Sequence, residues 1–144
     1  MPELPDGMGR NGREIVPVFD AEEKLFVRVQ PDHLVGGCVR PEAFRVPCQS
    51  CNREQFSEPD WVLSDWGVVY VRSGDVPPAF SSPNVDYNVD VEHVPLETNY
   101  SHSEIRVRRG IEPFLEKLNV SRKAGLDFKA RLARMASVAI PSRE

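Results

Sequence analysis

The sequence has no apolar run that approaches the ~18 residues needed to cross a bilayer, which argues against a membrane protein. Its first residues, from Met1 to Gly7, have neither the basic region nor the apolar region of a secretory signal, so we expect a cytoplasmic protein. A hydrophobic content of 40% and a length of 144 residues are typical of one globular domain. We expect a flexible leader over 1–14 and a single domain over 15–144.

Cysteine is scarce: the chain has Cys38, Cys48 and Cys51 and no others. An odd number of cysteines in a chain without a secretory signal does not favour a disulfide framework. We expect reduced thiols.

A surplus of positive charge is also missing, since the formal net charge is -4. Proteins that bind nucleic acid need clustered Lys and Arg, so a nucleic-acid partner is not favoured. The charge is nevertheless uneven: residues 1–103 carry 8 Lys and Arg against 17 Asp and Glu, whereas 104–144 carry 10 against 5. The basic tail is either a surface for an acidic partner or a segment that packs on its own acidic domain. We favour the second interpretation.

Alternation of apolar and polar residues predicts strands. The clearest case runs from Val85 to Glu92, where valines and Tyr87 alternate with carboxylates and Asn88. Similar patterns predict strands over 24–30, 67–72 and 104–109, whereas the stretch of 38–46 suits an edge strand or a loop. The proline-rich stretch of 73–84 is predicted to be a surface loop.

The apolar spacing changes to a helical period after Gly110, which predicts helices over 111–118 and 121–137, the second with Ser121 as N-cap. The outer side of the second helix is basic. Strands followed by helices indicate an α+β fold, a small and mostly antiparallel sheet covered by C-terminal helices. The predicted core consists of Leu25, Val27, Val69, Val71, Val89, Val91, Ile105, Phe114, Leu118, Phe128 and Leu132.

Two patterns contain residue types that bind zinc. Cys48 and Cys51, together with His102 and Glu104, supply both halves of a zinc deaminase signature, but in reversed order. Cys38, Cys48, Cys51 and His33 form a Cys3His set, but a single Cys-x-x-Cys pair is weak evidence for a structural site. We therefore expect no bound metal and no other cofactor.

The polar side of the 85–92 strand gathers Asp86, Asp90 and Glu92, which suits a divalent ion in a metal-dependent nuclease. Arg106 and Arg108 alternate on a neighbouring strand and offer a simpler explanation, cross-strand ion pairs. We favour the ion pairs.

A nucleophile elbow and a glycine-rich phosphate loop each require a preceding strand. The sequence has neither motif after a predicted strand. A small acidic α+β domain needs only a surface in order to bind, so we expect a non-catalytic binding or accessory domain with a possible protein partner. The alternative is a metal-dependent enzyme, either a zinc hydrolase or deaminase or a carboxylate–metal nuclease. Its candidate catalytic residues are His102 and Glu104 as acid and base, or Asp90 and Glu92 with a divalent ion.

Three segments, Leu25-Phe-Val-Arg-Val-Gln-Pro31, Cys38-Val-Arg-Pro-Glu-Ala-Phe44 and Gln49-Ser-Cys-Asn-Arg53, resemble a group of short uncharacterised bacterial proteins. The resemblance covers about 30 residues, and the group has valine where this chain has Cys51 and no cysteine at the place of Cys48. It implies a cytoplasmic bacterial protein and supplies no activity.

Overall fold

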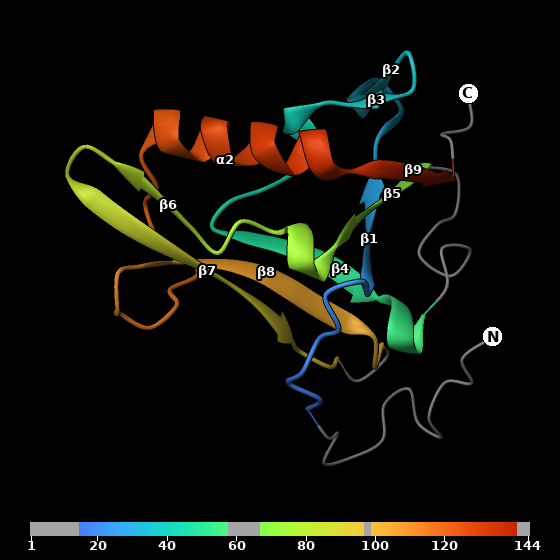
Figure 1. Ribbon diagram of the computed structural model, residues 1–144, viewed down its shortest axis with the longest axis horizontal. Helices are drawn as coiled ribbons and strands as arrows, with labels where there is room; N and C mark the ends of the chain where they lie inside the picture. The colour runs from blue at the N-terminus through green and yellow to red at the C-terminus, as the bar shows by residue number, and fades with distance from the viewer. Residues whose placement is uncertain (1–14, 58–66, 97–98, 141–144) are drawn as a thin grey trace.

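The computed structural model describes residues 15–57, 67–96 and 99–140 (Figure 1). Its main element is a seven-stranded antiparallel sheet with the order β6-β7-β8-β4-β1-β5-β9. In that order the strands are β6 (Ala79–Ser82), β7 (Val85–His93), β8 (His102–Arg109), β4 (Cys48–Arg53), β1 (Lys24–Val29), β5 (Gly67–Arg72) and β9 (Ser137–Ile140). The predicted leader over 1–14 lies outside the described residues.

The remaining elements are a short hairpin, one α-helix among the described residues, and 3-10 turns. The hairpin pairs β2 (Leu34–Val35) with β3 (Cys38–Val39), and the helix is α2 (Arg122–Met135). The turns are η1 (Pro31–His33), η2 (Pro41–Ala43), η3 (Glu54–Phe56) and η4 (Ser73–Asp75). Within the described part of the chain, no helix has the length and hydrophobicity that a bilayer crossing requires.

The core lies between α2 and one face of the curled sheet (Figure 1). Side chains alternate along a strand, so Leu25, Val27 and Val29 of β1 all point toward this core. Phe128 of α2 stacks on Phe80, with ring centroids 4.7 Å apart. Burying one such side chain contributes about 1.5–3 kcal/mol, which explains why the amphipathic helix packs on this face.

The strands predicted over 24–30, 67–72, 85–92 and 104–109 are confirmed as β1, β5, β7 and β8. The α+β class is also confirmed, although the fold is dominated by the sheet and its described part has a single covering helix. Most of the predicted core is buried; the exceptions are Val91, Phe114 and Leu118, which are partly exposed.

The helix predicted over 111–118 is wrong. Gly110 has a positive φ of 53°, and the chain then continues through turns in which Ile111 is 96% exposed. Pro113 has no backbone N–H, and a helix of eight residues has too few hydrogen bonds to form without tertiary packing. Phe114 instead lies against the guanidinium of Arg106, 4.6 Å from its ring centroid.

The second predicted helix ends earlier than expected, at Met135, and the chain continues into β9, which pairs with β5. Ser121 occupies the N-cap position, but its side chain makes no cap hydrogen bond, and its backbone N–H donates to the Tyr87 hydroxyl at 3.1 Å. The predicted loop over 73–84 contains an edge strand, β6. The central strand β4 was not predicted from the sequence.

Candidate functional site on the polar face of the sheet

The sheet face opposite α2 is polar across three adjacent strands. Register pairs Cys48 with Arg106, Ser50 with Glu104 and Asn52 with His102. Cross-strand partners share a face. This polar face therefore consists of Cys48, Ser50 and Asn52 on β4, His102, Glu104, Arg106 and Arg108 on β8, and Asp86, Asn88, Asp90 and Glu92 on β7.

The carboxylates of β7 are held by arginines of β8. Arg108 Nε donates to Asp90 Oδ2 at 2.7 Å, and Arg106 Nη1 lies 3.6 Å from Glu92 Oε2. The predicted cross-strand ion pairs are therefore confirmed. Each of these partly exposed pairs contributes at most about 1 kcal/mol of stability. Among the described residues, no group of three or more His, Cys, Asp or Glu side chains is arranged to hold a metal ion.

His102 and Glu104 lie side by side without a hydrogen bond between them. His102 Nε2 is 4.0 Å from Glu104 Oε2, beyond hydrogen-bond distance. His102 Nδ1 lies 2.9 Å from the carbonyl oxygen of Val94, which only accepts, so Nδ1 carries a proton. In neutral His102 the unprotonated nitrogen is therefore Nε2.

Glu104 is engaged by its neighbours. It accepts a hydrogen bond from Arg106 Nε at 2.8 Å and another from the thiol of Cys48. Burial favours a higher pKa for Glu104, but the hydrogen bonds from Arg106 and Cys48 and the positive charge of Arg106 outweigh it, and the pKa lies below the usual value. Glu104 is therefore a carboxylate at neutral pH and an unsuitable general acid.

The three cysteines are not brought together. Cys48 lies on the polar face, whereas Cys51, three residues later on the same strand, is buried in the core on the opposite face. Cys38 is exposed on β3. Burial and the hydrogen bond to Glu104 raise the pKa of Cys48 to about 12, and burial also raises the pKa of Cys51. Both thiols are therefore protonated and weakly nucleophilic at neutral pH.

A pocket of about 500 Å³ opens on the polar face where β1, β4 and β8 adjoin. Its volume lies within the range of small-molecule sites. Phe26 is among the lining residues but is only 3% exposed. The lining residues are Phe26, Arg28, Arg45, Cys48, Gln49, Ser50, Cys51, Asn52 and His102.

The orientation of the Asn52 amide in this pocket is fixed by a chain of hydrogen bonds. The backbone N–H of Ser101 donates to Asn99 Oδ1 at 3.2 Å, so the other amide atom of Asn99 is the nitrogen. That nitrogen donates to Asn52 Oδ1 at 2.6 Å. The single proton of the Ser101 hydroxyl is shared between Asn99 Oδ1 at 2.6 Å and Asn52 Oδ1 at 2.8 Å. Asn52 Nδ2 is left as a donor, and no acceptor for it lies among the described residues.

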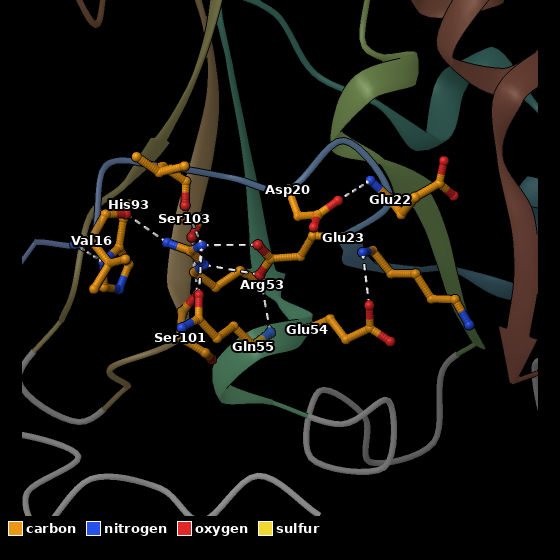
Figure 2. A network of polar contacts seen from close by, with 12 residues as sticks. Val16, Asp20, Glu22, Glu23, Arg53, Glu54, Gln55, His93, Ser101 and Ser103 are labelled. Atoms are coloured by element: carbon orange, nitrogen blue, oxygen red, sulfur yellow. Dashed lines mark hydrogen bonds and ion pairs between the residues drawn. The ribbon is translucent and has the colours of Figure 1, made fainter.

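A second polar network was not anticipated from the sequence: it surrounds Arg53, which is fully buried (Figure 2). Two hydrogen bonds join its guanidinium to Glu23, and further ones reach the carbonyl oxygens of Val16 and Val18 at 2.6 and 2.9 Å. The ring of Phe19 lies 3.8 Å from the guanidinium carbon. Every nitrogen of this guanidinium has a partner in the protein and the side chain is fully buried, so the network holds the 16–19 segment against β4.

His93 holds the same segment from β7. The N–H of Val16 donates to His93 Nδ1 at 2.9 Å, so His93 Nε2 carries the proton and donates to the Tyr100 carbonyl at 2.7 Å. Burial lowers the pKa of His93. Its ring stacks on Phe56. No short sequence pattern links residues 16, 23, 53 and 93, so only the fold reveals this cluster.

The helix α2 packs on the sheet through its apolar side, and its basic side lies on the outside. Among the described residues, none forms an ion pair with the cations Arg122, Lys123, Lys129, Arg131 and Arg134. Arg131 and Arg134 line a pocket together with Asp75, a residue of the acidic part of the chain.

Comparison of the chain with models of protein families, with curated proteins and with solved structures finds no match. The resemblance to short bacterial proteins therefore stays an expectation.

Proposed function

We propose that this protein is a non-catalytic binding domain and that the pocket between β1, β4 and β8 is its ligand site. The observation that carries the proposal is that the candidate catalytic groups are held by partners. Glu104 is bound by Arg106 and Cys48, and Asp90 is bound by Arg108. A catalytic pair needs a base within hydrogen-bond reach of its nucleophile or orienting group, and His102 lies 4.0 Å from Glu104.

The metal-dependent alternative receives less support. The two thiolates of a deaminase site must converge on one ion, but Cys48 and Cys51 point to opposite faces of β4. Cys38 lies on a separate hairpin. Asp90 and Glu92, the proposed nuclease ligands, face Arg108 and Arg106, whose positive charges disfavour a cation between them.

The proposal is tested by a thermal-shift screen of the full chain against a broad panel of carboxylates, phosphates, sugars and amines. Compounds that stabilise the protein are then incubated with it and followed by NMR. We expect at least one compound that raises Tm in a saturable manner and is recovered chemically unchanged. Consumption of the compound would show an enzyme.

Two arginine variants locate the site. Arg45→Ala removes an exposed cation from the pocket, and Arg122→Ala removes an exposed cation from α2 as the matched control. We expect the shift in Tm to shrink in Arg45→Ala and to persist in Arg122→Ala. Equal responses of the two variants, or no stabilising compound in the whole panel, would count against a ligand site in this pocket.

A second candidate function is binding of an acidic protein partner on the basic side of α2. It is favoured by the absence of ion pairs to the five α2 cations among the described residues. The test compares the wild type with a variant in which Arg122, Lys123 and Arg131 are changed to Glu. A partner with an acidic surface should be retained by the wild type at low salt and lost by the variant. Equal retention by both proteins would exclude this surface.

A further inference from the structure

We infer that the ligand of this pocket is a small molecule that carries an oxyanion, a carboxylate or a phosphate group. This inference rests on the proposed function and names the chemistry of its ligand. The charge of the lining supports this inference. Among the described lining residues is Arg45, an exposed cation, and none of them is Asp or Glu, although residues 1–103 as a whole carry 17 acidic residues against 8 basic ones.

The acidic residue next to the pocket does not cancel this charge. Glu104 accepts hydrogen bonds from Arg106 and from the Cys48 thiol, so its negative charge is already compensated. Arg106 also lies near Glu92 of β7. In the strand order β7 and β4 are on opposite sides of β8, so this contact is directed away from β4. Among the described residues, an anion that enters between β1, β4 and β8 therefore meets the exposed guanidinium of Arg45, and Glu104 presents no uncompensated carboxylate to it.

The direction of the hydrogen bonds also favours an oxyanion. Asn52 Oδ1 accepts from the amide nitrogen of Asn99, so the Asn52 amide offers the pocket its Nδ2 donor. The exposed Ser50 hydroxyl and the guanidinium of Arg45 add donors. Oxyanions accept hydrogen bonds and do not donate them when ionised, and they bind most strongly to charged donors.

The size of the pocket also limits the ligand. A pocket of about 500 Å³ is large for a bare ion and suits a metabolite. We therefore use four probes of metabolite size: citrate for carboxylates, glucose 6-phosphate for phosphates, glucose as the neutral analogue and putrescine as a cation. Binding to the full chain is measured by NMR and calorimetry at constant ionic strength, since salt screens exposed charges.

The most specific variant is Asn52→Asp. It keeps an oxygen that accepts from the Asn99 amide and replaces the Nδ2 donor by a second carboxylate oxygen. The matched control is Asn119→Asp, which adds the same charge at an exposed position outside the pocket. Arg45→Ala is a second pocket variant, and it changes a side chain that faces solvent, so it tests the inference even if Asn52→Asp is unstable.

We expect citrate or glucose 6-phosphate to bind and to shift the amide signals of Ser50 and Asn52. Affinity should fall about tenfold or more in Asn52→Asp and Arg45→Ala and stay within about twofold in Asn119→Asp. Which of the two anions binds distinguishes carboxylate from phosphate. Binding of glucose or putrescine in preference to the anions would overturn the oxyanion assignment and leave the proposed ligand site intact. Binding of none of the four probes, or anion binding that both pocket variants retain, would also overturn the assignment.

Discussion

Glu23 and Arg53 form a two-pronged ion pair inside the protein: Arg53 Nε donates to Glu23 Oε2 at 2.9 Å and Arg53 Nη2 donates to Oε1 at 2.8 Å. The Arg53 side chain is fully buried and that of Glu23 is 7% exposed. The backbone N–H of Gln55 also donates to Glu23. This pair connects the start of β1 to the end of β4, as Figure 2 shows, and so fixes one end of the strands that line the pocket.

Removing one charge of this pair should be costly. Glu23→Gln leaves the buried guanidinium without its counterion, and we expect a loss of about 3–5 kcal/mol in the free energy of unfolding, measured by urea denaturation. The matched control is the neighbouring Glu22→Gln, which removes a carboxylate that is 83% exposed and 3.2 Å from Arg72. That change should cost no more than about 1 kcal/mol. Similar losses in the two variants would contradict the structural role of Glu23.

His93 predicts a dependence of stability on pH. Its pKa lies below the usual 6.5 in the folded state because of burial, and protonation of Nδ1 would break the hydrogen bond from Val16. A group whose folded pKa is depressed stabilises the protein above its unfolded pKa, and this stability is lost as pH falls through the folded pKa. The free energy of unfolding should therefore decline as the pH falls below about 6.5.

The variant His93→Asn keeps an acceptor near the Val16 N–H and cannot titrate. We expect the variant to be less stable than the wild type at pH 8. As the pH falls just below 6.5, its free energy of unfolding should decline much less than that of the wild type. The pKa of Glu104 is also lowered in the folded state, so its ionised form stabilises the protein. By the same reasoning, this stabilisation is lost as the pH falls below the usual carboxyl range. An unchanged decline in His93→Asn would mean that another group causes it.

The cysteines predict a defined order of labelling. Cys38 is exposed, whereas Cys48 has a pKa of about 12 and Cys51 is buried in the core. Since the thiolate is the reactive form, a thiol reagent at pH 7.5 should modify Cys38 quickly and the other two only after unfolding. Mass spectrometry of peptides locates the label, and Cys38→Ser should abolish the rapid phase. Rapid modification of Cys48 would reveal an activated thiol and revive an enzymatic interpretation.

Elemental analysis tests the expectation that no metal is bound. Protein purified without chelator should contain much less than one equivalent of zinc, because Cys48 and Cys51 lie on opposite faces of β4. One equivalent of zinc that is lost in Cys48→Ser would contradict this expectation and would require the strand to be rearranged around an ion.

The parts of the fold that were predicted correctly share one property: each strand has an apolar side that faces the core. β7 is the best example, with Tyr87 and Val89 buried and Asn88 and Asp90 on the polar face. β4 was missed because its inward side chains, Gln49, Cys51 and Arg53, are largely polar. Their burial is made possible by partners such as Glu23, distant in sequence, and no local pattern records such partners.

The candidate site was predicted only in part. The sequence singled out Cys48, His102 and Glu104, and the fold does place them on one face of the sheet. It could not show that β4 and β8 are neighbours, because their register joins residues at least 50 positions apart. It therefore missed Asn52 and Arg45, whose significance depends on the pocket between those strands.

The most direct test of a binding function is a crystal structure of the full chain with the compound that stabilises it most in the thermal-shift screen. The proposal predicts the intact compound in the pocket, within hydrogen-bond distance of Asn52 Nδ2 and close to the guanidinium of Arg45. A compound bound elsewhere on the protein, or found there as a reaction product, would contradict it.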